Sequence, residues 1–195
     1  MPTTVLVTGA SSGIGRSIAE QLATDGHDIV VHFLGNESGA AATLAAVRER
    51  GRRGRLLRFD VGDRQAAAAA ISADIETHGA YYGVVVNAGV VRDAAFPMMS
   101  GEDWDQVLRT DLDGFYNVLH PAVMPMIRRH APGRIVSISA VSGIHGNRGQ
   151  ANYSAAKAGI VGLSKALAQE GAKKNIKVNI LAPMARTRMT ESLIG

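Results

Sequence analysis

The chain of 195 residues contains no cysteine. This absence excludes a disulfide framework, a zinc–thiolate site and a cysteine nucleophile, and it fits a reducing compartment. The sequence also lacks any run near the roughly 18 consecutive apolar residues that a membrane-spanning helix needs, and no charged and apolar leader precedes its first strand pattern. We therefore expect a cytoplasmic protein without a membrane partner.

Aromatic residues make up only 5% of the chain, although its net charge is +4. Much of the positive charge lies in one run of arginines: Arg48, Arg50, Arg52, Arg53, Arg55 and Arg58. Because no aromatic side chains for base stacking interrupt the run, we interpret it as a solvated face and expect no nucleic-acid partner. The histidines have no metal-ligand spacing, so we expect no metal.

Apolar runs rich in β-formers alternate along the chain with Ala-rich helical stretches, and 46% of the residues are hydrophobic. This alternation predicts an α/β fold with a doubly wound parallel sheet, in a single domain over residues 1–195. The expected strands are Thr4–Thr8, Asp28–Phe33, Arg55–Phe59, Gly83–Asn87, Arg134–Ser139 and Lys177–Leu181. The expected helices are Gly13–Thr24, Ser38–Arg50, Arg64–His78, Gly101–Arg129, which is open to a break, and Tyr153–Ala172.

A glycine-rich segment, Thr8–Gly15, joins the first predicted strand to the first predicted helix. Glycines at such a turn let backbone N–H groups approach a phosphate, and the helix amino end then faces the anion. A glycine cluster alone is as often structural. Its place on the first strand-to-helix turn of a doubly wound pattern favours a nucleotide site.

Tyr153 and Lys157 are four residues apart on a predicted helix, so both side chains leave one face. An ammonium near a phenol favours the phenolate, so we expect Lys157 to lower the pKa of Tyr153 and make it a proton donor to a carbonyl group. The alternative is an amphipathic core helix with a lysine at its margin. The glycine segment in the same chain favours the catalytic interpretation.

These two motifs and Asn87-Ala88-Gly89, which follows the fourth predicted strand, occur in an order that resembles the short-chain dehydrogenase/reductase family. The stretch from Gly146 to Gly159 is most similar to its 3-oxoacyl-[acyl-carrier-protein] reductase branch. The segment from Ala182 to Glu191 is instead similar to the hydroxyacyl-CoA dehydrogenase units of multifunctional enzymes.

The resemblance implies a Rossmann-type fold, a nicotinamide cofactor and reduction of β-oxoacyl thioesters. It implies that Tyr153 gives the proton and that Lys157 also holds the nicotinamide ribose. The cofactor-binding residues that it implies are Gly9, Ser11, Ser12, Gly13, Ile14, Gly15, Asp60, Val61, Asn87, Ala88, Gly89, Tyr153, Lys157 and Pro183. It also implies a homodimer or homotetramer that pairs through the helices predicted at Gly101–Arg129 and Tyr153–Ala172.

The sequence departs from the family at two catalytic positions. Ala140 stands where family members carry a serine whose hydroxyl binds the substrate oxygen, and Asp111 stands where they carry an asparagine. Ser139 should point to the opposite side of the strand, whereas Ser142 replaces the missing hydroxyl only if the backbone bends. Asp111 either stabilises the Lys157 ammonium or points away into solvent.

The chain ends before the lid and the last sheet strand of the family, so we expect a domain truncated at its C-terminus. No acidic residue ends the second predicted strand, which favours NADPH over NADH. Because Ser12 replaces the family's arginine in the glycine segment, His32, Asn36 or a residue of the arginine run would meet the 2′-phosphate.

Two functions from different classes remain open. The first is an NADPH-dependent reductase of β-oxoacyl thioesters, weakened by Ala140; the second is a nucleotide-binding or scaffold protein that has lost its chemistry. For the first we expect an acidic acyl carrier protein to dock on a basic group: Arg128, Arg129, Lys173 and Lys174. Asp60, expected at the adenine, is otherwise a turn residue or a helix cap.

Overall fold

The computed structural model describes residues 3–183, and its strands form one parallel sheet in the order β3-β2-β1-β4-β5-β6. The strands are β1 (Thr4–Val7), β2 (Asp28–Phe33), β3 (Gly54–Arg58), β4 (Gly83–Val86), β5 (Gly133–Ile138) and β6 (Ile176–Leu181). The doubly wound, Rossmann-type fold predicted from the sequence is confirmed. Within the described residues, no helix is both long and apolar enough to cross a membrane.

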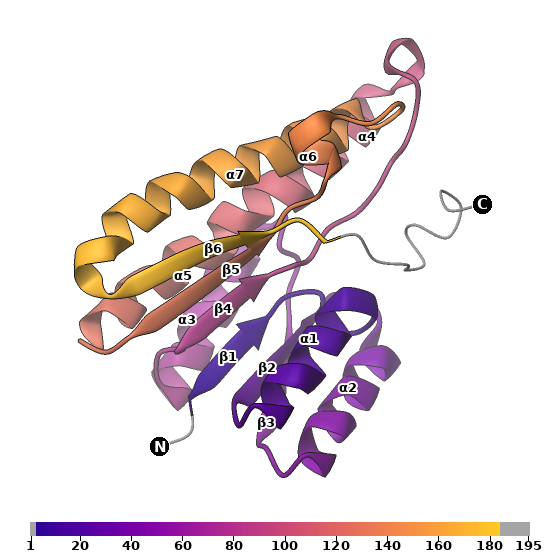
Figure 1. Cartoon of the computed structure of the whole chain (residues 1–195). Coiled ribbons are helices and arrows are strands. Elements are labelled where there is room, and N and C mark those ends of the chain that lie inside the picture. Colours follow the sequence, from indigo (N-terminus) through magenta and orange to yellow (C-terminus); the bar gives the residue numbers. More distant parts are fainter. Residues whose placement is uncertain (1–2, 184–195) are drawn as a thin grey trace.

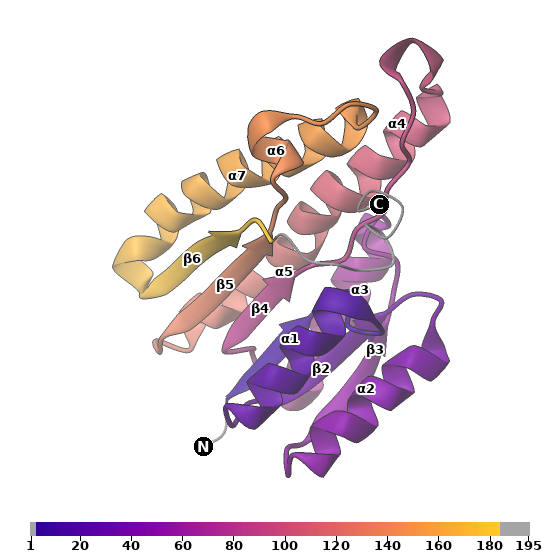
Figure 2. The same ribbon diagram turned by 45° about the vertical axis from the view of Figure 1, so that its right-hand side comes forward.

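Helices cover both faces of the sheet (Figures 1 and 2). The long ones are α1 (Gly13–Thr24), α2 (Glu37–Glu49), α3 (Arg64–His78), α4 (Gly101–Leu108), α5 (Gly114–Arg128) and α7 (Ala151–Gly171). The short ones are α6 (Ser142–His145), the 3-10 turns η1 (Phe96–Met98) and η3 (Ala172–Lys174), and the π-helical turn η2 (Arg109–Asp113). Each predicted long element is present, with ends shifted by one or two residues at most places.

The strands alternate their side chains between two hydrophobic cores. One core lies between the sheet and α3, α5 and α7, and it contains Phe115, Ile135 and Ile160. The other lies between the sheet and α1 and α2, and it contains Ile29, Val31 and Phe33. β2 is buried along its whole length, and residues 29–31 at its middle are all apolar rather than alternating.

The segment predicted as one helix over Gly101–Arg129 is interrupted by η2, which joins α4 to α5. A π turn adds a residue to the helical repeat and so changes which side chains face inward. Asp111 lies in this turn and is fully buried. The interruption therefore turns a charged side chain toward the interior of the protein.

The sheet reverses its winding between β1 and β4, which are neighbours although they are far apart in sequence. In open α/β sheets, ligands bind outside the carboxyl ends of the strands at this point. The predicted glycine segment follows β1, and Asn87 follows β4. Both segments therefore come together at the edge where a ligand is expected.

Candidate active site

A cavity of about 940 Å³ opens at the carboxyl edge of the sheet. Its size is typical of a small-molecule or cofactor site. The residues predicted from the sequence that line it are Gly9, Ser11, Ser12, Gly13, Ile14, Gly15, Asp60, Val61, Asn87, Ala88, Gly89, Ala140, Tyr153, Lys157 and Pro183. The remaining predicted catalytic residue, Asp111, does not line the cavity and lies buried behind it.

The glycine segment forms an open cradle at the amino end of α1. Gly13 has a positive φ of 55°, and a side chain added there would meet nothing within 4 Å. At Gly15, by contrast, an added Cβ would collide with the carbonyl oxygen of Gly9. No side chain caps α1 at Ser12, so the first N–H groups of the helix remain free for an anion. These features fit the phosphates of a dinucleotide.

A buried hydroxyl joins the glycine segment to the loop after β4. The N–H groups of Asn87 and Ala88 donate to Thr8 Oγ1 at 2.8 and 3.0 Å, and Asn87 Nδ2 donates to Thr8 O at 2.9 Å. Both loops are thus held in one arrangement. The strand-to-helix turn located this region from the sequence, but the bonding role of Thr8 had no separate signal.

His32 holds the glycine segment in place through a hydrogen bond to Gly9. Its Nδ1 accepts a hydrogen bond from the N–H of Gly9 at 3.0 Å, and its Nε2 lies 3.0 Å from the carbonyl oxygen of Phe59. Burial lowers the pKa of His32 to about 4, so the ring is neutral at pH 7. Of the three candidates for the 2′-phosphate, His32 is therefore removed, because both ring nitrogens are occupied and the ring carries no charge.

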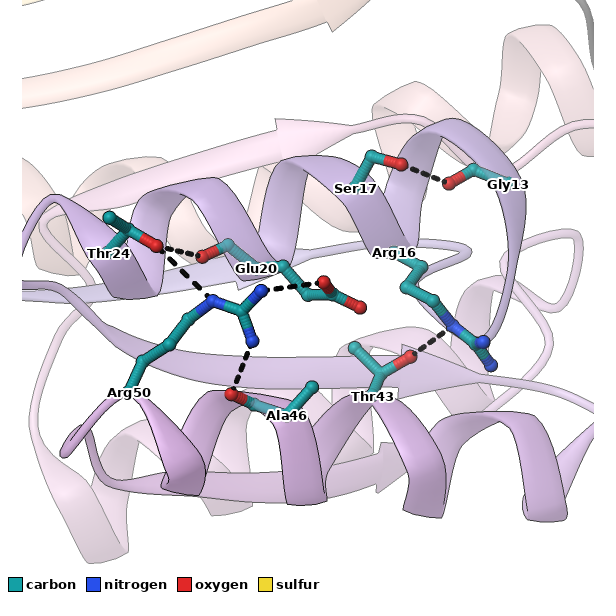
Figure 3. A network of polar contacts seen from close by, with 8 residues as sticks. All are labelled: Gly13, Arg16, Ser17, Glu20, Thr24, Thr43, Ala46 and Arg50. Carbon is teal, nitrogen blue, oxygen red and sulfur yellow. Dashed lines mark hydrogen bonds and ion pairs between the residues drawn. The ribbon is translucent and has the colours of Figure 1, made fainter.

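Arg16 fastens the glycine segment to α2 (Figure 3). Its Nε donates to Thr43 Oγ1 at 3.0 Å, and its Nη2 donates to the carbonyl oxygens of Ser11 and Gly39, each at 2.9 Å. The role of Arg16 was not predicted, because its position relative to the glycines matches no sequence motif. Arg16 acts on the cradle by holding backbone oxygens, which fixes the position of the loop.

Most of the arginine run forms ion pairs. Arg48, Arg50, Arg53 and Arg58 are nevertheless exposed, in keeping with the predicted solvated face, whereas Arg52 and Arg55 are half-buried. Arg50 pairs with Glu20 at 2.9 Å (Figure 3), and Arg55 pairs with Asp74 at 2.6 Å. Two further arginines, Arg52 and Arg53, converge on the buried carboxylate of Asp28 at 2.8 and 2.9 Å. The run therefore anchors β2 and β3 to their neighbours.

Lys157 is paired with Asp111 inside the protein. The Lys157 Nζ lies 3.1 Å from Asp111 Oδ2, and the two side chains are 3% and 0% exposed. Asp111 Oδ1 also accepts the N–H of Val90 at 2.7 Å, which ties the ion pair to the loop after β4. Of the two orientations considered for Asp111, the structure shows the one directed at Lys157.

The phenol of Tyr153 lies beside this pair, with Lys157 Nζ 5.3 Å from the centre of its ring. Burial, together with the negative charges of Asp111 and Asp93, raises the pKa of Tyr153 to about 12. The expected lowering by Lys157 is therefore wrong, because desolvation of the phenol dominates and the nearest cation is paired with a carboxylate. The phenol is protonated at pH 7.

The position of the missing serine hydroxyl is visible at the end of β5. Ala140 lines the cavity but offers only a methyl group, and the Ser139 hydroxyl donates to the carbonyl oxygen of Lys157 at 2.8 Å. Ser142 also lines the cavity, and it begins α6, a short helix that was not predicted from the sequence. Among the described residues, its hydroxyl has no hydrogen-bond partner.

Three polar residues near Tyr153 were missed in the sequence. Gln150 Nε2 donates to the Asp93 carboxylate at 3.1 Å, and Asn152 Nδ2 donates to the carbonyl oxygens of Arg92 and Asp103 at 3.0 and 3.2 Å. These bonds clamp the start of α7 to the segments that follow β4. Gln150 and Asn152 lie within the stretch that carries the family resemblance, whereas Asp93 had no signal.

The other predicted residues have separate places. Asp60 lines the cavity and closes its own turn by accepting the N–H of Gly62 at 2.8 Å, while Asp63 caps α3. The basic group of Arg128, Arg129, Lys173 and Lys174 lies at the ends of α5 and α7, near the amino ends of β5 and β6. The group is therefore at the edge of the sheet opposite the cavity. The predicted likeness over Ala182–Glu191 falls almost wholly outside the described residues.

A Rossmann-type sheet, a glycine cradle and a helical Tyr–Lys pair in one cavity define an oxidoreductase of the dinucleotide-binding α/β class. The family model for short chain dehydrogenase matches residues 3–194, and the chain belongs to that family.

Three relatives place the chain within the family. It is 61% identical over 183 residues to the 3-oxoacyl-[acyl-carrier-protein] reductase FabG of Aggregatibacter actinomycetemcomitans, covering 94% of this chain and 76% of that protein. It is 40% identical to the reductase of the same name from Chlamydia trachomatis, with 97% and 77% covered. It is 44% identical to the acetoacetyl-CoA reductase of an Acinetobacter species, with 91% and 72% covered.

Proposed function

We propose that this protein reduces β-oxoacyl thioesters with NADPH and that Tyr153 supplies the proton. The observation that carries the proposal is the shared cavity: Tyr153 and Lys157 face the same space as the glycine cradle. The relatives that act on 3-oxoacyl-carrier-protein and acetoacetyl-CoA support the β-oxoacyl thioester class. The lack of cysteine fits the reducing cytosol, where we propose that the chain works.

The residues of the chain would divide the work as follows. Bound NADPH supplies the hydride that reduces the carbonyl carbon. The protonated phenol of Tyr153 donates its proton to the carbonyl oxygen, so that a β-hydroxyacyl thioester forms. Lys157 would hold the ribose of the cofactor, and Asn87 to Gly89 would line its nicotinamide side. The α1 amino end would bind the phosphates through its free N–H groups.

The hydroxyl that binds the developing oxyanion is the weak part of this site. Ala140 cannot donate, and Ser139 is committed to Lys157. We infer that Ser142, which lines the same cavity two residues after Ala140, takes the place of the missing serine hydroxyl. Loss of one such donor typically reduces turnover by about 10²- to 10³-fold.

The experiment compares NADPH oxidation in the presence of acetoacetyl-CoA for the unmodified protein and for Ala140→Ser. We expect the restored hydroxyl to raise kcat by roughly 10²-fold or more. Ser142→Ala in the unmodified background should lower the remaining rate further. A rate at background for all three proteins, with NADPH demonstrably bound, would sink the reductase function.

That outcome would favour the second candidate, a nucleotide-binding or scaffold protein. Two observations favour it. Ala140 has no hydroxyl to offer a substrate, and Lys157 is already paired with the buried carboxylate of Asp111. Such a protein would bind the cofactor or assemble with an active relative without turnover.

We also propose that the chain works as a homodimer or homotetramer through α5 and α7. Tyr116 and Met124 on α5 are 42% and 53% exposed, as expected of a surface that pairs with another copy. An acyl carrier protein docked on Arg128 and Lys173 would then serve the cavity of a neighbouring subunit, because this basic group lies at the opposite edge of its own sheet. A light-scattering mass of one subunit would refute the assembly.

A further inference from the structure

The tip of β2 carries no acidic side chain, although it borders the cavity. In dinucleotide-binding sheets, an acidic residue at this tip binds the ribose hydroxyls of NAD, and an arginine near it accommodates the 2′-phosphate of NADP. The chain reads Phe33-Leu34-Gly35-Asn36 here, and Leu34, Gly35 and Asn36 line the cavity. The tip itself therefore supplies no cation, and Arg109, an arginine that lines the cavity, packs against Gly62 in the turn after β3.

The nearest polar side chains do not supply that cation. His32 is neutral, and both its nitrogens are occupied. Asn36 caps α2 by accepting the N–H of Gly39 at 3.0 Å. Arg16 lies beside the glycine segment, but it already donates to Thr43 (Figure 3) and to the carbonyl oxygens of Ser11 and Gly39.

Within the arginine run, one residue remains as a candidate for this cation. Four of its six members form ion pairs with Glu20, Asp28 or Asp74. The other two, Arg48 and Arg58, have no carboxylate partner among residues 3–183. Arg48 lies in the last turn of α2, at the end of that helix farthest from the β2 tip. Of these two, only Arg58 is close to the tip, where it lies beside the cavity-lining residue Leu34 without itself being part of the lining.

Arg58 is the last residue of β3, and it is paired in register with Phe33 at the end of β2. Leu56 and Phe33 pack in the core on the α1 and α2 face, so Arg58, two residues after Leu56, projects from the same face. Its Nε donates to the carbonyl oxygen of Leu34 at 3.0 Å. That bond fixes the guanidinium against the tip, and the side chain is exposed to an incoming ligand.

We propose that Arg58 determines cofactor choice by binding the 2′-phosphate of NADPH at the tip of β2. Neither Nη atom has a protein partner within the described residues, so the four N–H groups of the two Nη atoms remain for phosphate oxygens. The inference rests on the proposed function and names the residue that sets its preference for NADPH over NADH.

The test measures affinities by calorimetry for NADPH, NADH and 2′,5′-ADP, which isolates the phosphate-bearing half of the cofactor. We expect the unmodified protein to bind NADPH more tightly than NADH. Arg58→Ala should weaken the affinity for NADPH and for 2′,5′-ADP by about tenfold, as loss of an exposed charge-assisted contact predicts. The affinity for NADH should change by less than about twofold. Arg48→Ala is the matched control and should change none of the three.

A charge reversal gives a second readout. Arg58→Glu places a carboxylate at the tip, so it should reverse the preference toward NADH, and circular dichroism should confirm that both Arg58 variants remain folded. Unchanged NADPH affinity in Arg58→Ala, or equal losses for NADPH and NADH, would overturn the role of Arg58 while leaving the reductase function standing. An unmodified protein that binds neither dinucleotide would overturn both.

Discussion

Asp111 and Lys157 form an ion pair that is almost fully withdrawn from water. Burial raises the pKa of Asp111 above the ordinary carboxyl range, and the Lys157 ammonium and the N–H of Val90 oppose that rise. Breaking such a pair by removing one partner is costly, because the other charge stays buried. The pair therefore fixes Lys157 in place and at the same time supplies a negative charge next to Tyr153.

We predict that Asp111→Asn shifts the pH dependence of the reverse reaction to lower pH. The Asp111 charge helps to raise the pKa of Tyr153, so its removal should lower that pKa from about 12. Oxidation of a β-hydroxyacyl thioester needs the phenolate as a base, so its rate follows the ionised fraction. The rise of rate with pH should therefore come earlier in the variant, measured in an Ala140→Ser background to give a sufficient signal.

Asp93→Asn is the matched control for this measurement. The charge of Asp93 also raises the pKa of Tyr153, but its effect is smaller than that of Asp111. The shift should therefore have the same sign and be smaller. A displacement to higher pH in Asp111→Asn would contradict the electrostatic role that we assign to this carboxylate.

At the scale of residues, spacing in the sequence predicted the positions of the catalytic side chains but not their protonation states. The four-residue interval predicts that Tyr153 and Lys157 share a helix face, and both line the cavity. The direction of the Tyr153 pKa depends on burial and on Asp111, which comes from another helix through a π turn. No local pattern reports such contacts, and the same holds for Thr8 and His32.

At the scale of elements, the turn from β1 into α1 has little room for a larger side chain. Gly15 packs so closely on the carbonyl of Gly9 that only hydrogen fits, and Asn87 Nδ2 would lie 2.6 Å from an added Cβ. The same contact keeps the glycine segment against the loop after β4. Any side chain at Gly15 must separate these two segments.

We predict that Gly15→Ala destabilises the protein by about 1–3 kcal/mol, as overpacking of a tight contact does. It should also abolish measurable NADPH binding, because the cradle opens. Gly162→Ala is the control: Gly162 is exposed within α7, and an added Cβ meets nothing within 4 Å. That variant should gain about 0.5–1 kcal/mol from helix propensity and bind NADPH normally.

Denaturant unfolding followed by circular dichroism, together with a cofactor titration, measures both variants. Equal stability of Gly15→Ala and the unmodified protein would show that the loop yields without cost, which the close approach does not allow.

The strands and long helices were predictable because apolar periodicity is a local property. The expected bounds of α1, α3 and β2 agree with the structure. The interruption at η2 was predicted only as a possible break, because a π turn depends on what packs around it. The short helix α6 was missed because four residues contain too little periodicity to register.

For the whole molecule, the neutral buried His32 links folding to pH. Its pKa is about 4 in the folded chain and near 6.5 when unfolded, so the unfolded state binds the proton more readily. The resulting stability is fully present above pH 6.5 and is lost as the pH falls through about 4. The full difference is on the order of 3 kcal/mol.

We predict that His32→Gln flattens the dependence of unfolding free energy on pH between about 4 and 6.5. Chemical denaturation at several pH values measures this slope in both proteins, and the difference isolates His32 from the carboxylates of Asp28 and Asp74, whose pKa values are lowered by their arginine partners. Parallel curves for the two proteins would refute the linkage.

The central place of β1 also has a consequence for how the chain folds during synthesis. Of the described strands, β1 is synthesised first, and it needs β2 on one side and β4 on the other, where Val5 pairs with Gly83. Until that residue emerges, the strands β1–β3 can assemble only with α1, α2 and α3, and one edge of β1 stays open. The nucleotide cradle is therefore unfinished until Asn87 arrives to bond with Thr8, so a nascent chain stalled before this point should be unable to retain a dinucleotide.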